Sequence, residues 1–213
     1  MTRLKLIITD FDGVILNSEP AKDLAYKECF SFFPQQVDEF MSYHFENPTI
    51  GRYEKFKYFY ENILKIKYTN DCRKWISGRF NEIAYEKVSS SSFIPGALEF
   101  IKNFSKKLPI WIVTGTPKDE LVRVLKKLDI NQYFEKVFST PPNKSEILSK
   151  VLSDANISSE ETVFIGDMNN DLNSAKDNGI PFIGIETTEV FSGPRIAQMK
   201  DLKSIGSALT YYE

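Results

Sequence analysis

The sequence predicts an α/β fold, in which a parallel sheet carries helices on both faces and a helical segment is inserted near the start. After residue 92, short apolar segments rich in β-branched residues alternate with segments of helical periodicity. This alternation is typical of a parallel sheet. Residues 16–92 break the alternation, because they contain no convincing buried strand and are rich in Phe, Tyr, Lys and Glu. That composition favours an amphipathic helical bundle.

The predicted strands are short runs with few polar residues. The first, at residues 4–9, is apolar and β-branched, which suits a buried strand. Apolar residues at helical spacing predict helices at 97–104 and 121–128. Besides the first strand, the sequence predicts strands at 109–114, 161–165 and 180–185, and a weaker one at 134–138.

Both ends of the insertion carry residues that suit hinges. The entry at residues 17–20 (Asn-Ser-Glu-Pro) combines a good N-cap residue with a proline that a first helical turn tolerates. The exit is a run of four serines at residues 89–92, soon followed by Pro95-Gly96. We therefore expect an α/β core formed by residues 1–15 and 93–213 and a helical cap formed by residues 16–92.

The composition limits the classes of partner. The chain has 213 residues, 42% hydrophobic and 26% charged, which is ordinary for a globular protein. Its formal net charge of −2 provides no overall positive field, so we expect neither nucleic acid nor a membrane as a partner. The apolar run at the N-terminus soon meets acidic residues, which argues against a signal peptide or a membrane span. Cys29 and Cys72 form no Cys-x-x-Cys pair, so we expect free thiols in a cytoplasmic protein, most simply a monomer.

Acidic residues follow two of the predicted strands. Asp10 and Asp12, with Gly13 next to them, come directly after the strand at 4–9, and residues 166–171 (Gly-Asp-Met-Asn-Asn-Asp) follow the strand at 161–165. Ligands of open α/β sheets bind beyond the carboxyl ends of the strands, and carboxylate oxygens are the ligands that magnesium prefers. The alternative is that both segments are ordinary polar turns.

Two weaker segments follow the other strands. Thr114 and Gly115 could bind a phosphate oxygen through a hydroxyl and an amide, while Thr116 is expected to be the N-cap of the next helix, with Pro117 at its first position and Asp119 closing a capping box. Simple strand-to-helix punctuation explains the same residues. Lys144 places a positive charge near a helix start, where the helix dipole does not need it; the alternative is an exposed surface lysine.

These four segments, in this order, resemble the four motifs of the haloacid dehalogenase superfamily. The resemblance runs from Asp10 to Asp171, and Asp10-x-Asp12-Gly-Val and Gly166-Asp167-x-x-Asn170-Asp171 are its specific parts. The insertion resembles the helical cap of the phosphoglycolate phosphatase and β-phosphoglucomutase branch. The family fold implied is a Rossmann-like parallel sheet core with an inserted α-helical cap domain.

The resemblance also implies roles for the motif residues. Asp10 would attack phosphorus and form an aspartyl-phosphate, and Asp12 would protonate the leaving alcohol and then deprotonate the attacking water. Lys144 would neutralise phosphate oxygens, and Thr114 with the amide of Gly115 would complete a phosphate cradle. The implied cofactor is Mg²⁺, bound by Asp10, the backbone carbonyl of Asp12, and Asp167, with Asp171 beside it.

In related caps, a loop between two helices contacts the substrate. Residues 44–52 match that loop, because Asn-Pro and Gly mark the segment as non-helical. Arg52 at its end could hold a carboxylate or a second phosphate of the substrate, or it could be a surface arginine. His44 is the only histidine, and we expect it to be packed or exposed rather than catalytic.

The resemblance therefore implies a magnesium-dependent phosphatase that hydrolyses a small phosphorylated metabolite through an aspartyl-phosphate intermediate. Its partner would be a small-molecule phosphate ester. One alternative is a phosphomutase of the β-phosphoglucomutase type, which needs a second phosphate site at which only Arg52 hints. The other is a non-catalytic phosphate-binding module, which would have no need of both Asp10 and Asp12.

Overall fold

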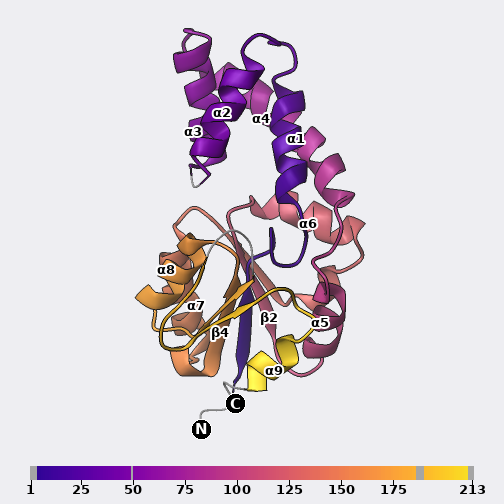
Figure 1. Cartoon of the computed structure of the whole chain (residues 1–213), viewed down its shortest axis with the longest axis vertical. Coiled ribbons are helices and arrows are strands. Elements are labelled where there is room, and N and C mark those ends of the chain that lie inside the picture. The colour runs from indigo at the N-terminus through magenta and orange to yellow at the C-terminus, as the bar shows by residue number, and fades with distance from the viewer. Residues whose placement is uncertain (1–3, 49, 186–189, 211–213) are drawn as a thin grey trace. The chain divides into compact units, whose positions relative to one another are not determined.

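The computed structural model describes residues 4–48, 50–185 and 190–210 of the chain. Two compact units make up the structure. The core unit comprises Met1–Ser18 and Ser91–Glu213, and the helical unit comprises Glu19–Ser90. Figure 1 labels their helices and strands. Among the described residues, no helix is long and apolar enough to cross a membrane.

The core unit is built on a six-stranded sheet in which every neighbouring pair is parallel. The α/β parallel fold predicted from the sequence is confirmed. The strand order is β3-β2-β1-β4-β5-β6, so the chain leaves β1 towards one edge and later returns to its other side at β4. The strands are β1 (Leu6–Thr9), β2 (Ile110–Thr114), β3 (Lys136–Ser139), β4 (Thr162–Gly166), β5 (Phe182–Ile185) and β6 (Ile196–Met199).

Helices bury the sheet because the inner strands are apolar on both faces; all residues of β1, β2, β4 and β5 are buried. One face packs on α7 (Lys144–Ala155) and α8 (Asn169–Asp177), whose Leu148, Val151 and Ala175 join Leu6 and Phe164 of the strands in one cluster. Figure 1 shows α5 (Ala97–Phe104) on the opposite side of the sheet from these two helices. The core unit also contains α6 (Lys118–Lys127) and α9 (Ile205–Thr210).

The helical unit consists of α1 (Glu19–Cys29), α2 (Val37–Glu46), α3 (Arg52–Tyr58), a single π-helical turn at Phe59–Ile63, and α4 (Asn70–Ser89). Its core is largely aromatic. Phe30 packs on Phe59 and Phe40 with ring centroids 3.9 and 4.4 Å away, and Tyr26 lies 4.5 Å from Phe80. Burial of these rings stabilises the helical unit, and their tilted geometry adds to the area term.

The two linkers between the units are paired where they leave the core unit. Leu16 forms an antiparallel bridge with Phe93, and the Asn17 amide donates to the carbonyl of Ser92 at 2.9 Å. These contacts join the two linkers to each other within the core unit.

Candidate active site

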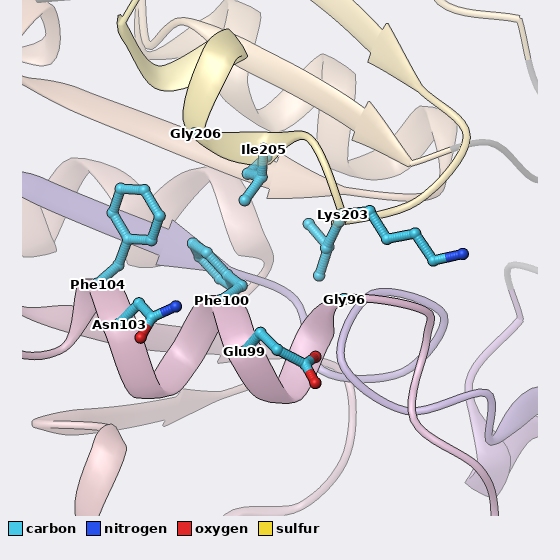
Figure 2. A pocket seen from close by; sticks show the side chains of 9 residues that line it. Gly96, Glu99, Phe100, Asn103, Phe104, Lys203, Ile205 and Gly206 are labelled. Carbon is cyan, nitrogen blue, oxygen red and sulfur yellow. The ribbon is translucent and has the colours of Figure 1, made fainter.

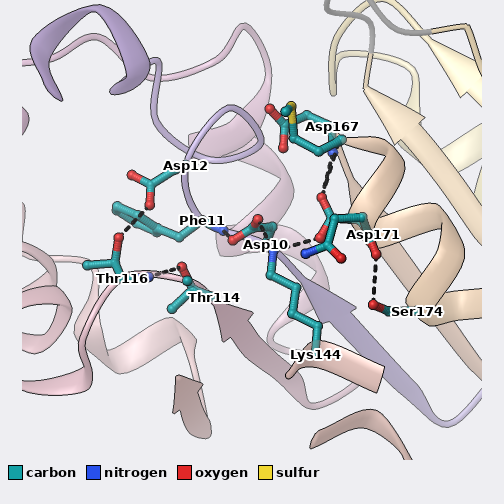
Figure 3. Close-up of polar contacts among 12 residues, drawn as sticks. Asp10, Phe11, Asp12, Thr114, Thr116, Lys144, Asp167, Asp171 and Ser174 are labelled. Atoms are coloured by element: carbon teal, nitrogen blue, oxygen red, sulfur yellow. Dashed lines mark hydrogen bonds and ion pairs between the residues drawn. The ribbon is translucent and has the colours of Figure 1, made fainter. Parts of the chain in front are cut away.

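Three buried side chains from different elements meet at the carboxyl end of β1 (Figure 3). Asp10 directly follows β1, Lys144 is the first residue of α7, and Asp171 lies in the first turn of α8. The Lys144 ammonium donates to Asp10 Oδ2, and it donates to Asp171 Oδ1 at 2.6 Å. Asn143 caps α7 by accepting the Glu146 amide at 2.9 Å, which fixes the start of the helix that carries Lys144. Lys144 is thus a buried ion-pair partner and not an exposed lysine.

Asp167 adds a third carboxylate to this group. Asp10, Asp167 and Asp171 each offer an oxygen, and these oxygens lie within 4.8 Å of one another. All three residues are buried, with Asp167 3% exposed. Asp171 Oδ2 also accepts the backbone amides of Asp167 and Met168 at 3.3 and 3.2 Å, which ties the loop after β4 to the start of α8.

Two glycines give the acids room. Gly13 has φ +75°, and a β-carbon there would lie 2.0 Å from Asp167 Oδ2. A β-carbon at Gly166 would lie 2.5 Å from Cβ of Asp171. Neither position can carry a side chain without moving a carboxylate. The group that approaches Gly13 in the structure is the carboxylate of Asp167.

The crowding of charges alters proton affinities. Burial raises the pKa of Asp10 to about 6; Lys144 opposes this rise, and the neighbouring Asp171 and Asp12 add to it. For Lys144, burial lowers the pKa, but Asp10 and Asp171 outweigh burial, so its pKa lies above the usual value. The ammonium therefore stays protonated, while the acid cluster carries more negative charge than one lysine can balance.

Asp12 is held separately from this cluster, by two hydroxyl groups. Ser18 Oγ donates to Asp12 Oδ1 at 2.5 Å, and Thr116 Oγ1 donates to Asp12 Oδ2 at 2.7 Å. The expectation that Thr116 caps α6 is wrong. The N-cap position belongs to Pro117, the helix starts at Lys118, and no side chain caps it. The Thr116 hydroxyl is engaged by Asp12 instead.

The predicted phosphate-binding pair lies at the end of β2. Thr114 is buried, and its Oγ1 accepts the Thr116 amide at 3.1 Å. Gly115 is exposed, and nothing lies within 4 Å of where its β-carbon would be. Figure 3 places Thr114 and Thr116 beside Asp12 and Asp10. The ends of β1 and β2 therefore bring a hydroxyl and an open backbone segment to the acids.

Arg52 and His44 belong to the helical unit. Arg52 opens α3, donates to Asn81 Oδ1 at 2.9 Å, and lies over the ring of Phe80 at 4.5 Å. His44 is buried, in agreement with the packed alternative expected from the sequence. It contacts Asp23 and Lys55. Arg52 is thus held in a defined orientation by a polar and an aromatic partner.

A pocket of about 490 Å³ in the core unit lies away from these residues, between α5 and the segment that leads into α9 (Figure 2). Its wall is formed by Phe100, Phe104 and Ile205, with Glu99 and Lys203 at its rim. None of the predicted site residues lines it. Glu99 is the only acid that lines it, so the pocket lacks the second carboxylate that a nucleophile with a metal ligand beside it would need, and it is not the candidate site.

Comparisons with known proteins identify the relatives of this chain. The model of the haloacid dehalogenase-like hydrolases matches residues 7–185. A phosphorylated carbohydrates phosphatase of Thermotoga maritima is 26% identical over 183 residues, which is 83% of this chain and 82% of that enzyme. The phosphoglycolate phosphatase of Escherichia coli K12 is 28% identical over 119 residues, 53% of this chain and 46% of that enzyme.

The fold is also shared with solved structures. The HAD hydrolase YfnB of Bacillus subtilis, solved with magnesium, superimposes with a TM-score of 0.75 at 18% identity, covering 98% of this chain and 99% of that one. The family match runs from residue 7, within β1, to residue 185 at the end of β5, and it includes every acid of the site. The chain is therefore an enzyme of the haloacid dehalogenase-like hydrolase family.

Proposed function

We propose that this enzyme is a phosphatase that hydrolyses a small phosphorylated metabolite, with Asp10 as the nucleophile. The observation that carries the proposal is the buried carboxylate of Asp10 at the end of β1, paired with Lys144 and beside Asp167 and Asp171. Phosphoryl transfer depends mainly on positioning and on neutralising charge. This cluster combines a fixed nucleophile with a fixed cation.

Asp10 is oriented for attack by its own neighbours. Its Oδ1 accepts the Phe11 amide at 2.6 Å and its Oδ2 accepts from Lys144. Attack on phosphorus forms a bond from a carboxylate oxygen of Asp10 and breaks the bond to the alcohol of the ester. Water then cleaves the acyl phosphate, and Asp10 is restored with release of inorganic phosphate. The ammonium of Lys144 reduces the repulsion between the carboxylate and the phosphate oxygens.

Asp12 is proposed as the general acid and base. In the first step it gives a proton to the leaving alcohol, and in the second step it takes one from water. Hydroxyl groups can donate to an ionised carboxylate and can accept from a protonated one. The contacts of Asp12 with Ser18 and Thr116 therefore suit both protonation states.

The three clustered acids fit a magnesium ion. Oxygen ligands of this kind are what Mg²⁺ takes, and it commonly binds through one or two carboxylates together with substrate phosphate. A cation there would offset the negative charge that Lys144 alone does not balance. Asp10 and Asp167 would hold it, with the backbone carbonyl of Asp12, and Asp171 would lie beside it. When bound, Mg²⁺ supplies charge neutralisation for the phosphoryl group.

The substrate's phosphate would meet Thr114 and Gly115. The hydroxyl of Thr114 can donate to a phosphate oxygen while its oxygen accepts the Thr116 amide, and the exposed amide of Gly115 can donate beside it. We propose that the helical unit acts as a cap that contacts the leaving group, with Arg52 as the residue for an anionic substituent. The names of the two curated relatives make sugar phosphates and phosphoglycolate the first substrates to try.

The test is release of inorganic phosphate from an aryl phosphate and from a panel of phosphorylated metabolites. We expect magnesium-dependent turnover that a chelator removes. Asp10→Asn, which is nearly isosteric but is a poor nucleophile, should lower turnover at least about a thousandfold with an unchanged circular dichroism spectrum. Wild-type turnover in this variant would rule out the covalent mechanism. Transfer of phosphate to a second sugar in place of water would favour the phosphomutase, and no turnover on any ester would favour the binding module.

A further inference from the structure

A side-chain amide joins the two helices that carry the cation and one of the acids of the site. Asn178 directly follows α8 and is half-buried. Its Nδ2 donates to the backbone carbonyl of Ser145 at 3.0 Å and to that of Ser174 at 2.9 Å, and it lies 3.2 Å from Ser145 Oγ. Ser145 is the residue after Lys144 at the start of α7. Asn178 therefore connects the end of α8 to the first turn of α7.

The orientation of this amide follows from its partners. A backbone carbonyl only accepts, so two carbonyls within 3.0 Å require the nitrogen of Asn178, and not its oxygen, to face them. The bond to Ser174 stays within the last turns of α8, four residues back, whereas the bond to Ser145 reaches 33 residues back along the chain. The first bond fixes the side chain on α8, and the second fixes the start of α7 relative to it.

The same two helices are joined a second time, at the site itself. Lys144 Nζ donates to Asp171 Oδ1 at 2.6 Å, and Asp171 lies in the first turn of α8. Between the two links, α7 and α8 pack together in one buried apolar cluster. The contacts close a ring, because the ammonium is bound to the start of α8 and the backbone next to its own residue is bound to the end of α8.

We propose that Asn178 is a positioning residue of the phosphatase reaction, which fixes the start of α7 on α8 and thereby places the ammonium of Lys144. A lysine stem is long and flexible, so the place of its ammonium depends on where the stem begins. That ammonium donates to Asp10 and, in the proposed reaction, has to meet the phosphate oxygens as well. The proposal rests on the proposed function and extends it to a residue that lies beyond the four motifs, which end at Asp171.

The competing explanation is that Asn178 only ends α8 and stabilises the core unit. A residue of that kind would lower activity through the amount or stability of folded protein, whether or not Lys144 is present. A positioning residue acts through Lys144 alone. The two explanations therefore differ in whether the effect of changing Asn178 depends on the lysine.

The first experiment measures kcat for an aryl phosphate with the full chain and magnesium. Asn178→Ala should lower kcat about tenfold, because the cation is no longer held in its place. Asn178→His should recover most of this loss, because its Nδ1–H lies the same number of bonds from the backbone as Nδ2 of asparagine. Gln132→Ala is the matched control, since it removes another amide of the core unit that donates to a backbone carbonyl, that of Asp129 at 2.8 Å. It should keep the wild-type kcat.

A double-mutant cycle separates the two explanations. In a Lys144→Met background, Asn178→Ala should change kcat by less than about twofold, because no ammonium remains to be placed. A loss of about tenfold in both backgrounds, or a wild-type kcat in Asn178→Ala alone, overturns the proposal.

A second measurement needs no turnover. The ammonium of Lys144 is buried between Asp10 and Asp171, so its hydrogens should exchange slowly enough to give a nitrogen–proton NMR signal, assigned by its loss in Lys144→Met. Asn178→Ala should shift or broaden this signal, and Gln132→Ala should leave it in place. An unchanged signal in Asn178→Ala overturns the proposal. If the signal responds as expected but no ester is hydrolysed, the phosphatase assignment fails while the placement of Lys144 by Asn178 stands.

Discussion

At the scale of single residues, the two acids that follow β1 have opposite surroundings. Asp10 accepts from the ammonium of Lys144 and faces two further acids. Asp12 accepts hydrogen bonds from the neutral hydroxyl groups of Ser18 and Thr116. Asp10 is thus held by a charged partner, and Asp12 is held by hydroxyl groups that can rotate. A nucleophile benefits from the first environment, and a group that must gain and lose a proton benefits from the second.

The hydroxyl contact of Thr116 gives a prediction about leaving groups. Thr116→Val removes the hydrogen bond at 2.7 Å to Asp12 Oδ2 while keeping the shape of the side chain. A hydrogen bond to a charged group contributes about 1.5–3 kcal/mol, so turnover of alkyl phosphates should fall about ten- to a hundredfold. Aryl phosphates need less protonation of the leaving oxygen and should lose far less.

Thr116→Ser is the matched control, because it restores the hydroxyl and should restore the rate. The readout is kcat/KM over a series of esters with rising leaving-group pKa. A loss that is equal across the series would contradict an effect through Asp12.

Sequence reasoning found the charged members of this site but not their neutral supports. Asp10, Asp12, Lys144, Asp167 and Asp171 were all singled out, because they follow predicted strands and occur in the order of the four family motifs. Ser18 and Thr116 were taken for helix punctuation, because a hydroxyl before a helix usually caps it. The contact that claims Thr116 comes from Asp12, 104 residues earlier, and no local pattern reports a contact of that range.

At the scale of elements, the loops after β1 and β4 hold the acids in place by close approach of the backbone. Gly13→Ala would put a β-carbon 2.0 Å from Asp167 Oδ2 and would also strain the backbone at φ +75°. We expect Asp167 to be displaced, with a rise of about tenfold or more in the magnesium concentration for half-maximal turnover. The measurement is a magnesium titration of activity.

Gly78→Ala on α4 is the control for this substitution, because nothing lies within 4 Å of its added β-carbon. Its magnesium titration should match that of the wild type. An unchanged titration for Gly13→Ala would mean that Asp167 is not needed for the metal.

Burial of Lys55 gives a second prediction at this scale, about the pH dependence of stability. The pKa of Lys55 is lowered from 10.5 to about 8 in the folded protein, so between these values the unfolded chain binds more protons than the folded one. Stability contributed by this residue must then rise with pH across that window. Lys55→Met should reduce the slope of the unfolding free energy against pH there, by at most about 1.4 kcal/mol per pH unit.

The comparison with wild type is essential, since burial also raises the pKa values of Tyr26, Tyr60 and Cys29 to about 12, and these groups lower stability at high pH in both proteins. Lys57→Met on the same helix should leave the slope unchanged. The free energy of unfolding of all three proteins is measured by denaturant titration at several values between pH 7.5 and 10. Equal slopes for the wild type and Lys55→Met would show that Lys55 keeps an ordinary proton affinity.

The elements themselves were predictable to different degrees. The five strands expected from apolar runs are all present. The strands predicted at 4–9, 109–114, 161–165 and 180–185 start one or two residues later than expected, and the weak one at 134–138 is found at Lys136–Ser139. The helix at 97–104 has the expected bounds. β6 was missed because Ile196–Met199 is a half-buried edge strand of four residues, with little β-branched or alternating pattern. An edge strand buries less apolar surface than an inner strand. Its sequence therefore needs less of the β-branched or alternating pattern by which a strand is recognised.

At the scale of the whole molecule, the proposed function assigns general chemistry and substrate choice to different parts of the chain. The motif residues all lie in the core unit, and in the proposed mechanism they bind the phosphoryl group that every substrate shares. Discrimination among phosphate esters therefore needs contacts with the leaving group. The helical unit contributes none of the acids of the site and has its own aromatic core. It is the part of the chain that can vary its surface without disturbing the chemistry.

The prediction at this scale concerns Arg52, and it rests on the helical unit acting as a cap. Arg52→Ala should raise KM for the best metabolite substrate and leave a small aryl phosphate almost unaffected. Loss of a charge-assisted contact costs about 1.5–3 kcal/mol, or roughly ten- to a hundredfold in kcat/KM. Arg52 also packs on Phe80 and donates to Asn81, so a structural loss has to be separated from a loss of recognition. Arg73→Ala is the matched control, because that guanidinium also lies over an aromatic ring, Tyr53, at 4.3 Å. Both substrates are measured on the three proteins. Parallel losses on the two substrates in Arg52→Ala would assign Arg52 to the packing of α3 on α4, and an unchanged KM for the metabolite would move the search for specificity to other residues of Glu19–Ser90.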